Sequence, residues 1–312
     1  MPRYATALVI LSYSICTLGW AQDEAKEKVN FPQADIFLFE LTNEDGKLNV
    51  GNGRNVTARP GYENQPFFVA DSSSFLFSRS DDYQTDIYEY FIATGDIKQI
   101  TSTEISEFSP QPSPDNQTIS FVTDGEKANL SVCHVRRDDS NPTWTLNNQT
   151  EREPIGYYSW NHETGFILFW SRYGFNVRLV HESKPVSHYV SGNAVPTSPH
   201  IIPGTKNFSF LHRQGNGQVW IKELDPETLA VRPLTPVVGN NTHYGWTPEG
   251  AIVMVEGSVL HLWRPGSDTG WQRVADLKSQ GLGSATRIAV SPNGKWLAVV
   301  GLPLNTRTNE ED

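Results

Sequence analysis

Six polar residues, spaced 41 to 48 positions apart, are the part of this sequence best suited to chemistry. Gln65, Ser109 and Ser198 each come directly before a proline in a short apolar segment. Tyr157, His243 and Arg287 occupy the equivalent position in three similar segments in which another residue replaces the proline. The set contains one fixed cation, one histidine and no carboxylate. Arg287 and His243 could therefore hold an anionic or hydroxyl-rich ligand. The alternative is a water-filled channel with no cognate ligand.

The motifs of hydrolases and metal sites are missing from the sequence. No Gly-x-Ser occurs anywhere, which excludes the nucleophile elbow of α/β-hydrolases. His162-Glu163 and His181-Glu182 begin like a zinc motif, but neither histidine is followed by another four residues later. A catalytic metal would also need histidines and carboxylates that converge, and the six polar residues include no carboxylate. We therefore expect no catalytic residue, no metal site and no cofactor.

For two further sets of residues, we expect a structural role rather than a functional one. Arg79 and Asp86 would lie on neighbouring strands, which favours an ordinary ion pair over a cation site. Phe68, Trp160 and Trp246 fall on the opposite face of their segments from the six polar residues. We expect these aromatic side chains to pack in the core, although a stacking platform for sugars is the alternative.

The elements that position these residues are short strands joined by tight turns. Ser291-Pro292-Asn293-Gly294 is a turn followed by an apolar strand, and Ser113 to Asn116 and Thr247 to Gly250 are weaker copies. Each unit of about 44 residues holds four such strands and shows no long helical periodicity. A four-stranded meander that recurs with this period predicts the blades of an all-β propeller.

The two ends of the chain predict how the ring closes. After Arg287 only two strands remain, whereas residues 35–57 form a hairpin with no unit of its own. Five complete units and one blade shared between the N-terminal hairpin and the C-terminal strands make a six-bladed propeller. A shared blade would leave no exposed edge strand where the chain ends meet.

The repeat resembles that of the TolB-type, WD40-like propellers over about residues 34 to 302. One unit carries most of the pattern, and parts of it return elsewhere: Ser78-Arg79-Ser80-Asp81, Asp86-Ile87-Tyr88, Thr94-Gly95 and Ile100-Thr101, then Leu234-Thr235 and Ser291-Pro292-Asn293-Gly294. The third unit departs most, with Trp160-Asn161-His162-Glu163 in place of the turn. Proteins with this repeat include secreted scaffolds, gating domains of peptidases and some sugar-cleaving enzymes, so the resemblance implies a fold more strongly than an activity.

The rest of the chain indicates export and argues against nucleic acid. Residues 1–21 have the basic start, apolar run and small-x-small end of a secretory signal, residues 22–33 form a charged spacer, and residues 303–312 an acidic tail that we expect to be disordered. The formal net charge is −10, with no basic cluster, which is unfavourable for nucleic-acid binding. No segment has the length of a membrane span. Outside the signal the chain has one cysteine, Cys133, in an apolar strand, where a buried inert thiol is expected.

These observations predict an exported, non-enzymatic binding or scaffold module, periplasmic or secreted. It would be a monomer that engages a protein or cell-envelope ligand through the propeller face or the channel mouth. The alternative is a carbohydrate- or lactone-cleaving enzyme acting at that mouth, a hypothesis motivated by Tyr157, His243 and Arg287 in one predicted ring.

Overall fold

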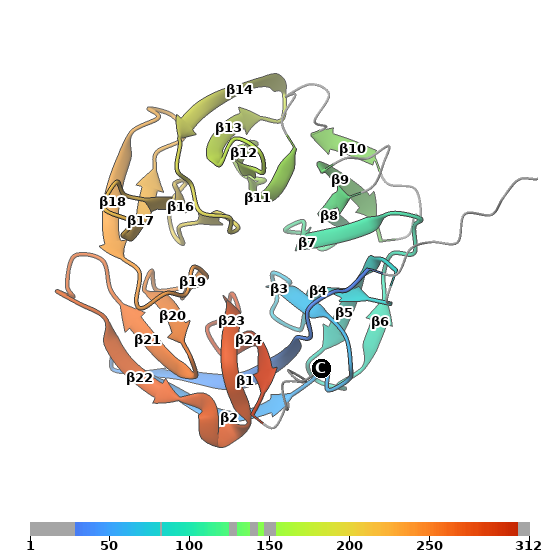
Figure 1. Cartoon of the computed structure of the whole chain (residues 1–312), viewed down its shortest axis with the longest axis vertical. Helices are drawn as coiled ribbons and strands as arrows, with labels where there is room; N and C mark the ends of the chain where they lie inside the picture. The colour runs from blue at the N-terminus through green and yellow to red at the C-terminus, as the bar shows by residue number, and fades with distance from the viewer. Residues whose placement is uncertain (1–28, 82, 125–129, 138–142, 147–153, 305–312) are drawn as a thin grey trace, which may run out of the picture.

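The computed structural model describes residues 29–81, 83–124, 130–137, 143–146 and 154–304. The predicted secretory signal, most of the spacer, and residues 305–312 of the predicted tail lie outside these ranges. Within them, six four-stranded antiparallel sheets stand in a ring around a common centre (Figure 1). The six-bladed all-β propeller is therefore confirmed.

Five of the blades are continuous in sequence, with the first strand innermost. Blade 1 consists of β3 (Glu63–Phe68), β4 (Ser74–Ser80), β5 (Thr85–Phe91) and β6 (Ile97–Gln99). Blade 2 consists of β7 (Ser106–Pro112), β8 (Thr118–Asp124), β9 (Ser131–Arg136) and β10 (Thr143–Leu146). Blade 3 consists of β11 (Ile155–Asn161), β12 (Phe166–Ser171), β13 (Asn176–His181) and β14 (Lys184–Ser191). Blade 4 consists of β15 (His200–Ile201), β16 (Phe208–Arg213), β17 (Val219–Leu224) and β18 (Val231–Pro236). Blade 5 consists of β19 (Tyr244–Trp246), β20 (Ile252–Glu256), β21 (Val259–Trp263) and β22 (Gln272–Asp276).

The sixth blade is shared between the two ends of the chain. Its strand order is β2-β1-β24-β23, formed by β1 (Asp35–Glu44), β2 (Lys47–Asn55), β23 (Leu282–Val290) and β24 (Trp296–Pro303). β1 and β24 pair antiparallel from Asp35↔Gly301 to Glu40↔Trp296. A short 3-10 helix, η1 (Leu277–Gln280), leads into β23. The predicted closure of the ring by a shared blade is confirmed.

The turn that follows β23 shows why the sequence repeats as it does. Gly294 has φ 69°, a left-handed conformation that other residues adopt only with strain. The Asn293 side chain accepts hydrogen bonds from the backbone N–H of Lys295 and from the Ser291 hydroxyl, which stabilises the reversal locally. The Asn293 N–H donates to Ser72 Oγ of blade 1 at 3.1 Å. This turn therefore also joins the shared blade to its neighbour.

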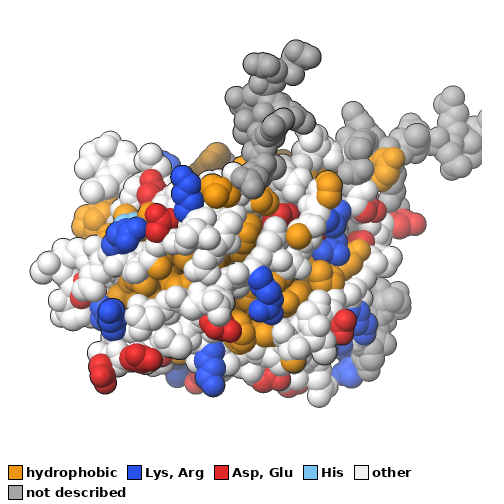
Figure 2. Space-filling model, turned by 90° about the horizontal axis from the view of Figure 1, so that it is seen from below, with side chains coloured by type: hydrophobic (Ala, Val, Ile, Leu, Met, Phe, Trp, Pro, Cys, Tyr) orange, Lys and Arg blue, Asp and Glu red, His pale blue; other side chains and the backbone are white. Residues whose placement is uncertain are grey.

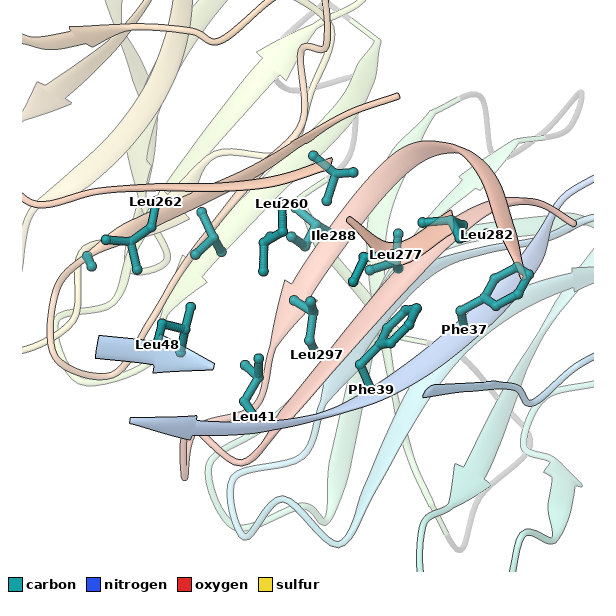
Figure 3. Packing of buried hydrophobic residues seen from close by; sticks show 14 residues of the cluster. Phe37, Phe39, Leu41, Leu48, Leu260, Leu262, Leu277, Leu282, Ile288 and Leu297 are labelled. Carbon is teal, nitrogen blue, oxygen red and sulfur yellow. The ribbon is translucent and has the colours of Figure 1, made fainter. Parts of the chain in front are cut away.

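Apolar side chains fill the spaces between adjacent blades. The cluster between blade 5 and the shared blade includes Phe39, Leu260, Leu277 and Leu297, all fully buried (Figure 3). Cys133 is buried in another interblade cluster, and burial raises the pKa of its thiol to about 12. The expected burial of this thiol is therefore confirmed, and its raised pKa agrees with low reactivity. On the side that Figure 2 shows, acidic and basic side chains are interspersed over the ring.

Candidate functional site

A β-bulge aims the ring residues of four blades toward the centre of the propeller. The strand register shifts next to Gln65, Ser109, Tyr157 and Arg287 on the innermost strands β3, β7, β11 and β23. At Gln65 (φ 59°) and Ser109 (φ 54°) the backbone is left-handed, which is uncommon for residues other than glycine. Bulges re-aim side chains and often adjoin functional sites.

A central cavity of about 470 Å³ begins at the ring residues and extends toward the turns that end the inner strands. All six blades contribute to its lining. Gln65, Ser109, Ser198, His243 and Arg287 line it as predicted, whereas Tyr157 is not among the lining residues. The volume lies in the range typical of sites for small ligands.

The cavity is apolar along its walls and polar at the ring. Its walls include prolines from five blades together with aromatic side chains: Pro66, Pro110, Pro199, Pro203, Pro248 and Pro292, then Phe67, Tyr244 and Trp246. Phe67 is 41% exposed, so it presents an aromatic ring to solvent. No aspartate or glutamate lines the cavity among the described residues. Its polar end therefore carries the positive charge of Arg287 with no acidic residue among its neighbours in the lining.

Arg287 crosses from the shared blade to blade 3, which lies opposite it in the ring (Figure 1). Its Nη2 donates to the Tyr157 hydroxyl at 2.8 Å, and its guanidinium carbon lies 5.1 Å from the centroid of the Tyr157 ring. Its Nη1 lies 3.4 Å from Nδ1 of His243 on the adjacent blade. The structure thus brings together Tyr157, His243 and Arg287, three of the six predicted residues.

His243 is held as a neutral imidazole. Burial lowers the pKa of His243 well below its usual value, and the neighbouring charge of Arg287 lowers it further. Because an arginine nitrogen only donates, the contact with Arg287 favours the tautomer in which Nδ1 accepts and Nε2 carries the proton. Thr197 Oγ1 lies 3.0 Å from the same Nδ1. His243 therefore offers an N–H donor rather than a second cation.

Gln65 and Ser109 meet on the other side of the ring. Gln65 Oε1 accepts from the backbone N–H of Ser109 at 2.8 Å and from the Ser78 hydroxyl at 3.0 Å. Ser109 is 5% exposed, and its buried hydroxyl oxygen has no hydrogen-bond partner among the described residues. A buried hydroxyl without a partner is costly, so this cavity contains a polar position that a ligand or a water could satisfy.

Sequence reasoning missed two residues that support Arg287 and His243. Thr197 comes directly before the predicted Ser198, and it is Thr197 that hydrogen-bonds His243. Tyr62 is buried, and burial raises the pKa of its hydroxyl to about 12, although the nearby charge of Arg287 opposes that shift. Thr197 lies in a bend before β15 rather than in a strand, so strand alternation could not place it, and no motif marks Tyr62.

The three aromatic residues pack in the core and also reach the cavity lining. Phe68 and Trp246 are buried, and Trp246 Nε1 donates to Ser209 Oγ of blade 4 at 2.9 Å, which agrees with the expected core packing. Trp160 is half-buried, packs against the apolar cluster between blades 2 and 3, and stacks on His162 with ring centroids 4.3 Å apart. The prediction of core packing therefore holds for Phe68 and Trp246 and in part for Trp160.

The expected ion pair between Arg79 and Asp86 does not form, although the two residues are register partners on β4 and β5. Arg79 Nε instead lies 2.9 Å from a carboxylate oxygen of Glu63, its register partner on β3. Asp86 accepts from the side-chain amides of Gln84 and Gln99. Glu63 is fully buried, so it draws the cation inward more strongly.

Within the described ranges, no group of three or more His, Cys, Asp or Glu side chains is placed to hold a metal ion. The same residues include no helix with the length and apolar character that a membrane span requires. Export, cofactor use and partner choice thus remain predictions at this point.

No family model and no curated protein matches the sequence. Solved structures do resemble it. A structure assigned as TolB from Agrobacterium tumefaciens is 14% identical with a TM-score of 0.66, over 86% of this chain and 98% of that chain. TolB from Acinetobacter baumannii is 13% identical with a TM-score of 0.56, over 86% and 64%. An oligogalacturonate lyase in complex with manganese is 15% identical with a TM-score of 0.54, over 86% of each chain. At these identities the likeness concerns the fold alone: the chain is a six-bladed β-propeller that resembles the propellers of these TolB structures.

Proposed function

We propose that this protein is a non-enzymatic binding module that holds a protein or cell-envelope ligand at its central cavity. The observation that carries the proposal is the cavity itself: apolar walls surround a polar end in which an arginine without a carboxylate partner lies beside a neutral histidine. Such a site recognises a ligand through one charge and much apolar contact. The fold likeness to two TolB structures supports the same class of function.

Capture from an envelope extract tests this function. The immobilised chain should retain a partner that an Arg287→Ala/His243→Ala variant loses. Arg213→Ala is the matched control, because Arg213 is exposed on blade 4 and its side chain hydrogen-bonds, among the described residues, only the backbone carbonyl of Gly217. Equal capture by the double variant and the wild type would place binding elsewhere on the ring, and no capture by either would count against a binding module.

The proposal includes export to the periplasm or the medium as a monomer. The predicted signal over residues 1–21 is its basis. Fractionation of cells that express the full chain should recover a shortened product outside the cytoplasm, and light scattering should give the mass of one chain. A full-length product in the cytoplasm would contradict export.

An enzyme of the sugar-cleaving class is the second candidate, and the likeness to an oligogalacturonate lyase favours it. That structure holds manganese, but the residues of this cavity do not fit a divalent cation, because its charged side chain is Arg287 and no carboxylate lines it among the described residues. Incubation with oligogalacturonate, with and without Mn²⁺, tests the candidate. Release of shorter sugars that Arg287→Ala abolishes would establish an enzyme in place of a binding module.

A further inference from the structure

The charge of Arg287 is uncompensated inside the protein. It forms no ion pair with any carboxylate of the described residues, and its guanidinium nitrogens contact two uncharged groups, the Tyr157 hydroxyl and His243 Nδ1. Two other arginines, in contrast, form ion pairs with buried carboxylates: Arg79 pairs with Glu63, and Arg137 pairs with Glu89. A half-buried cation without a counter-ion favours an anion as its missing partner.

The polar end of the cavity retains unused donors. A guanidinium has five N–H groups, and the contacts to Tyr157 and His243 use two of them. The hydroxyl oxygen of Ser109, which is buried in the lining, has no hydrogen-bond partner among the described residues. His243 contacts Thr197 and Arg287 through Nδ1, which leaves Nε2 for a ligand. These groups supply one full positive charge and neutral donors. One charge suits a monoanion such as a carboxylate better than a phosphate dianion, which usually draws several cations.

The walls disfavour a ligand that is polar throughout. Beyond the ring residues, most of the lining is built from prolines and from apolar or aromatic side chains, which include Phe67, Trp246, Ile288 and Val290. A few polar side chains interrupt it: Gln111, Ser159, Thr197, His200 and Ser291. A free sugar would bury most of its hydroxyls against the apolar groups without hydrogen bonds, at a cost for each one. An apolar body gains free energy from the same surface.

We propose that the cavity takes a ligand with a single carboxylate on an apolar body, inserted carboxylate-first so that the anion meets Arg287 and the apolar part lies against the proline-rich walls. This proposal rests on the proposed binding function and specifies its ligand. Two sources present this chemistry: a free hydrophobic carboxylic acid, and the C-terminal carboxylate of a peptide that ends in apolar residues.

Calorimetry with matched pairs of probes tests the proposal on the full chain. The first pair is 3-phenylpropionate and its amide, and the second is acetyl-Gly-Val-Phe with a free or an amidated C-terminus. We expect at least one carboxylate to bind at least tenfold more tightly than its amide, and the stronger pair identifies the source. Galacturonate, which has the carboxylate without the apolar body, should bind at least tenfold more weakly than that probe.

Variants distinguish a designed site from general attraction. Arg287→Gln should weaken binding of the stronger carboxylate at least tenfold, and Ser109→Ala by a few-fold, whereas Arg213→Gln should leave it unchanged. Ser109→Ala changes no charge, so it keeps the test valid if Arg287→Gln lowers the melting temperature. Equal binding of acid and amide, or no binding of either carboxylate, would overturn the proposal. If Arg287→Gln captured the same envelope partner as the wild type, the carboxylate proposal would be overturned and the proposed binding function would stand. If carboxylates bound but no partner were captured, the cavity would have the proposed ligand chemistry and the envelope-binding function would be overturned.

Discussion

The Tyr157 hydroxyl accepts a hydrogen bond from Arg287 at 2.8 Å across the centre of the ring, although 130 residues separate the two in sequence. The same tyrosine lies under the guanidinium, so one side chain both orients and partly screens the cation. Tyr157 does not line the cavity. Its part in the site is to position Arg287.

Replacing Tyr157 with Phe tests this positioning. The variant keeps the ring beneath Arg287 and removes the hydrogen bond, so we expect the free energy of unfolding to fall by about 1 kcal/mol. In the variant, Nη2 of Arg287 can donate this hydrogen bond to a ligand instead, but the guanidinium is no longer held in one orientation. Denaturant unfolding measures the first effect, and an unchanged stability would show that the bond contributes nothing to the fold.

Glu107 should make stability depend on pH. Its carboxylate is fully buried between blades 1 and 2, where it accepts from the Thr101 and Thr103 hydroxyls, and burial raises its pKa from 4.5 to about 7. The folded protein therefore holds this proton more tightly than the unfolded chain. The stabilisation is complete below about pH 4.5 and is lost as the pH rises to about 7.

Glu107→Gln should remove this dependence. At pH 8 the buried charge costs about 3 kcal/mol, so the variant should unfold at a higher denaturant concentration than the wild type there, less any loss from the threonine hydrogen bonds. At pH 4 the advantage should disappear. Glu249→Gln, at an exposed turn, is the control and should follow the wild type. Parallel curves for wild type and Glu107→Gln between pH 4 and 8 would contradict the prediction.

Gly301→Ala should destabilise the shared blade. A Cβ at Gly301 would lie 2.2 Å from the backbone carbonyl oxygen of Ser284, which cannot move away as a flexible side chain can. We expect a loss of about 1–3 kcal/mol in the free energy of unfolding. Gly270→Ala is the matched control, since a Cβ there meets nothing within 4 Å. Similar melting temperatures for the two variants would show that β23 and β24 can separate without cost.

Deleting the N-terminal hairpin, residues 34–57, should unfold the ring rather than trim it. Removal of β1 exposes β24 and strips Phe37, Phe39 and Leu41 from the core beside blade 5 (Figure 3). Thermal unfolding followed by circular dichroism should show no cooperative transition. A synthetic peptide of the hairpin, added in trans, should restore one, whereas a scrambled peptide should not. Full stability of the deletion variant would refute closure by the shared blade.

The repeat period was enough to predict most of the fold and part of the candidate site. Because one residue per blade recurs at the same position, the period alone placed Tyr157, His243 and Arg287 in one ring, and the structure brings them into contact. Register also placed Arg79 beside Asp86 correctly. The register could not show which carboxylate pairs with Arg79, because Glu63 lies beside Arg79 on the other neighbouring strand. Glu63 is fully buried, and a sequence does not display burial.

The supporting residues were beyond the sequence for a different reason. Thr197 hydrogen-bonds His243 from the neighbouring blade, and such contacts depend on how far each blade is rotated about the ring. No period encodes that rotation. The repeat could not predict the partial burial of Trp160 either, because the turn after β11, where Trp160 stacks on His162, departs from the repeat.

The pairing of β1 with β24 joins residue 35 to residue 301. During synthesis, β1 can form its hairpin with β2 early, but its other edge must wait for β24, which follows all the other blades in the chain. The loop that must close is therefore long, although its entropic cost rises only slowly, by about 0.6 kcal/mol for each doubling of length. The delay matters more, because long-range strand pairing is slow. A chain that ends before β24 can build its early blades but cannot close the ring.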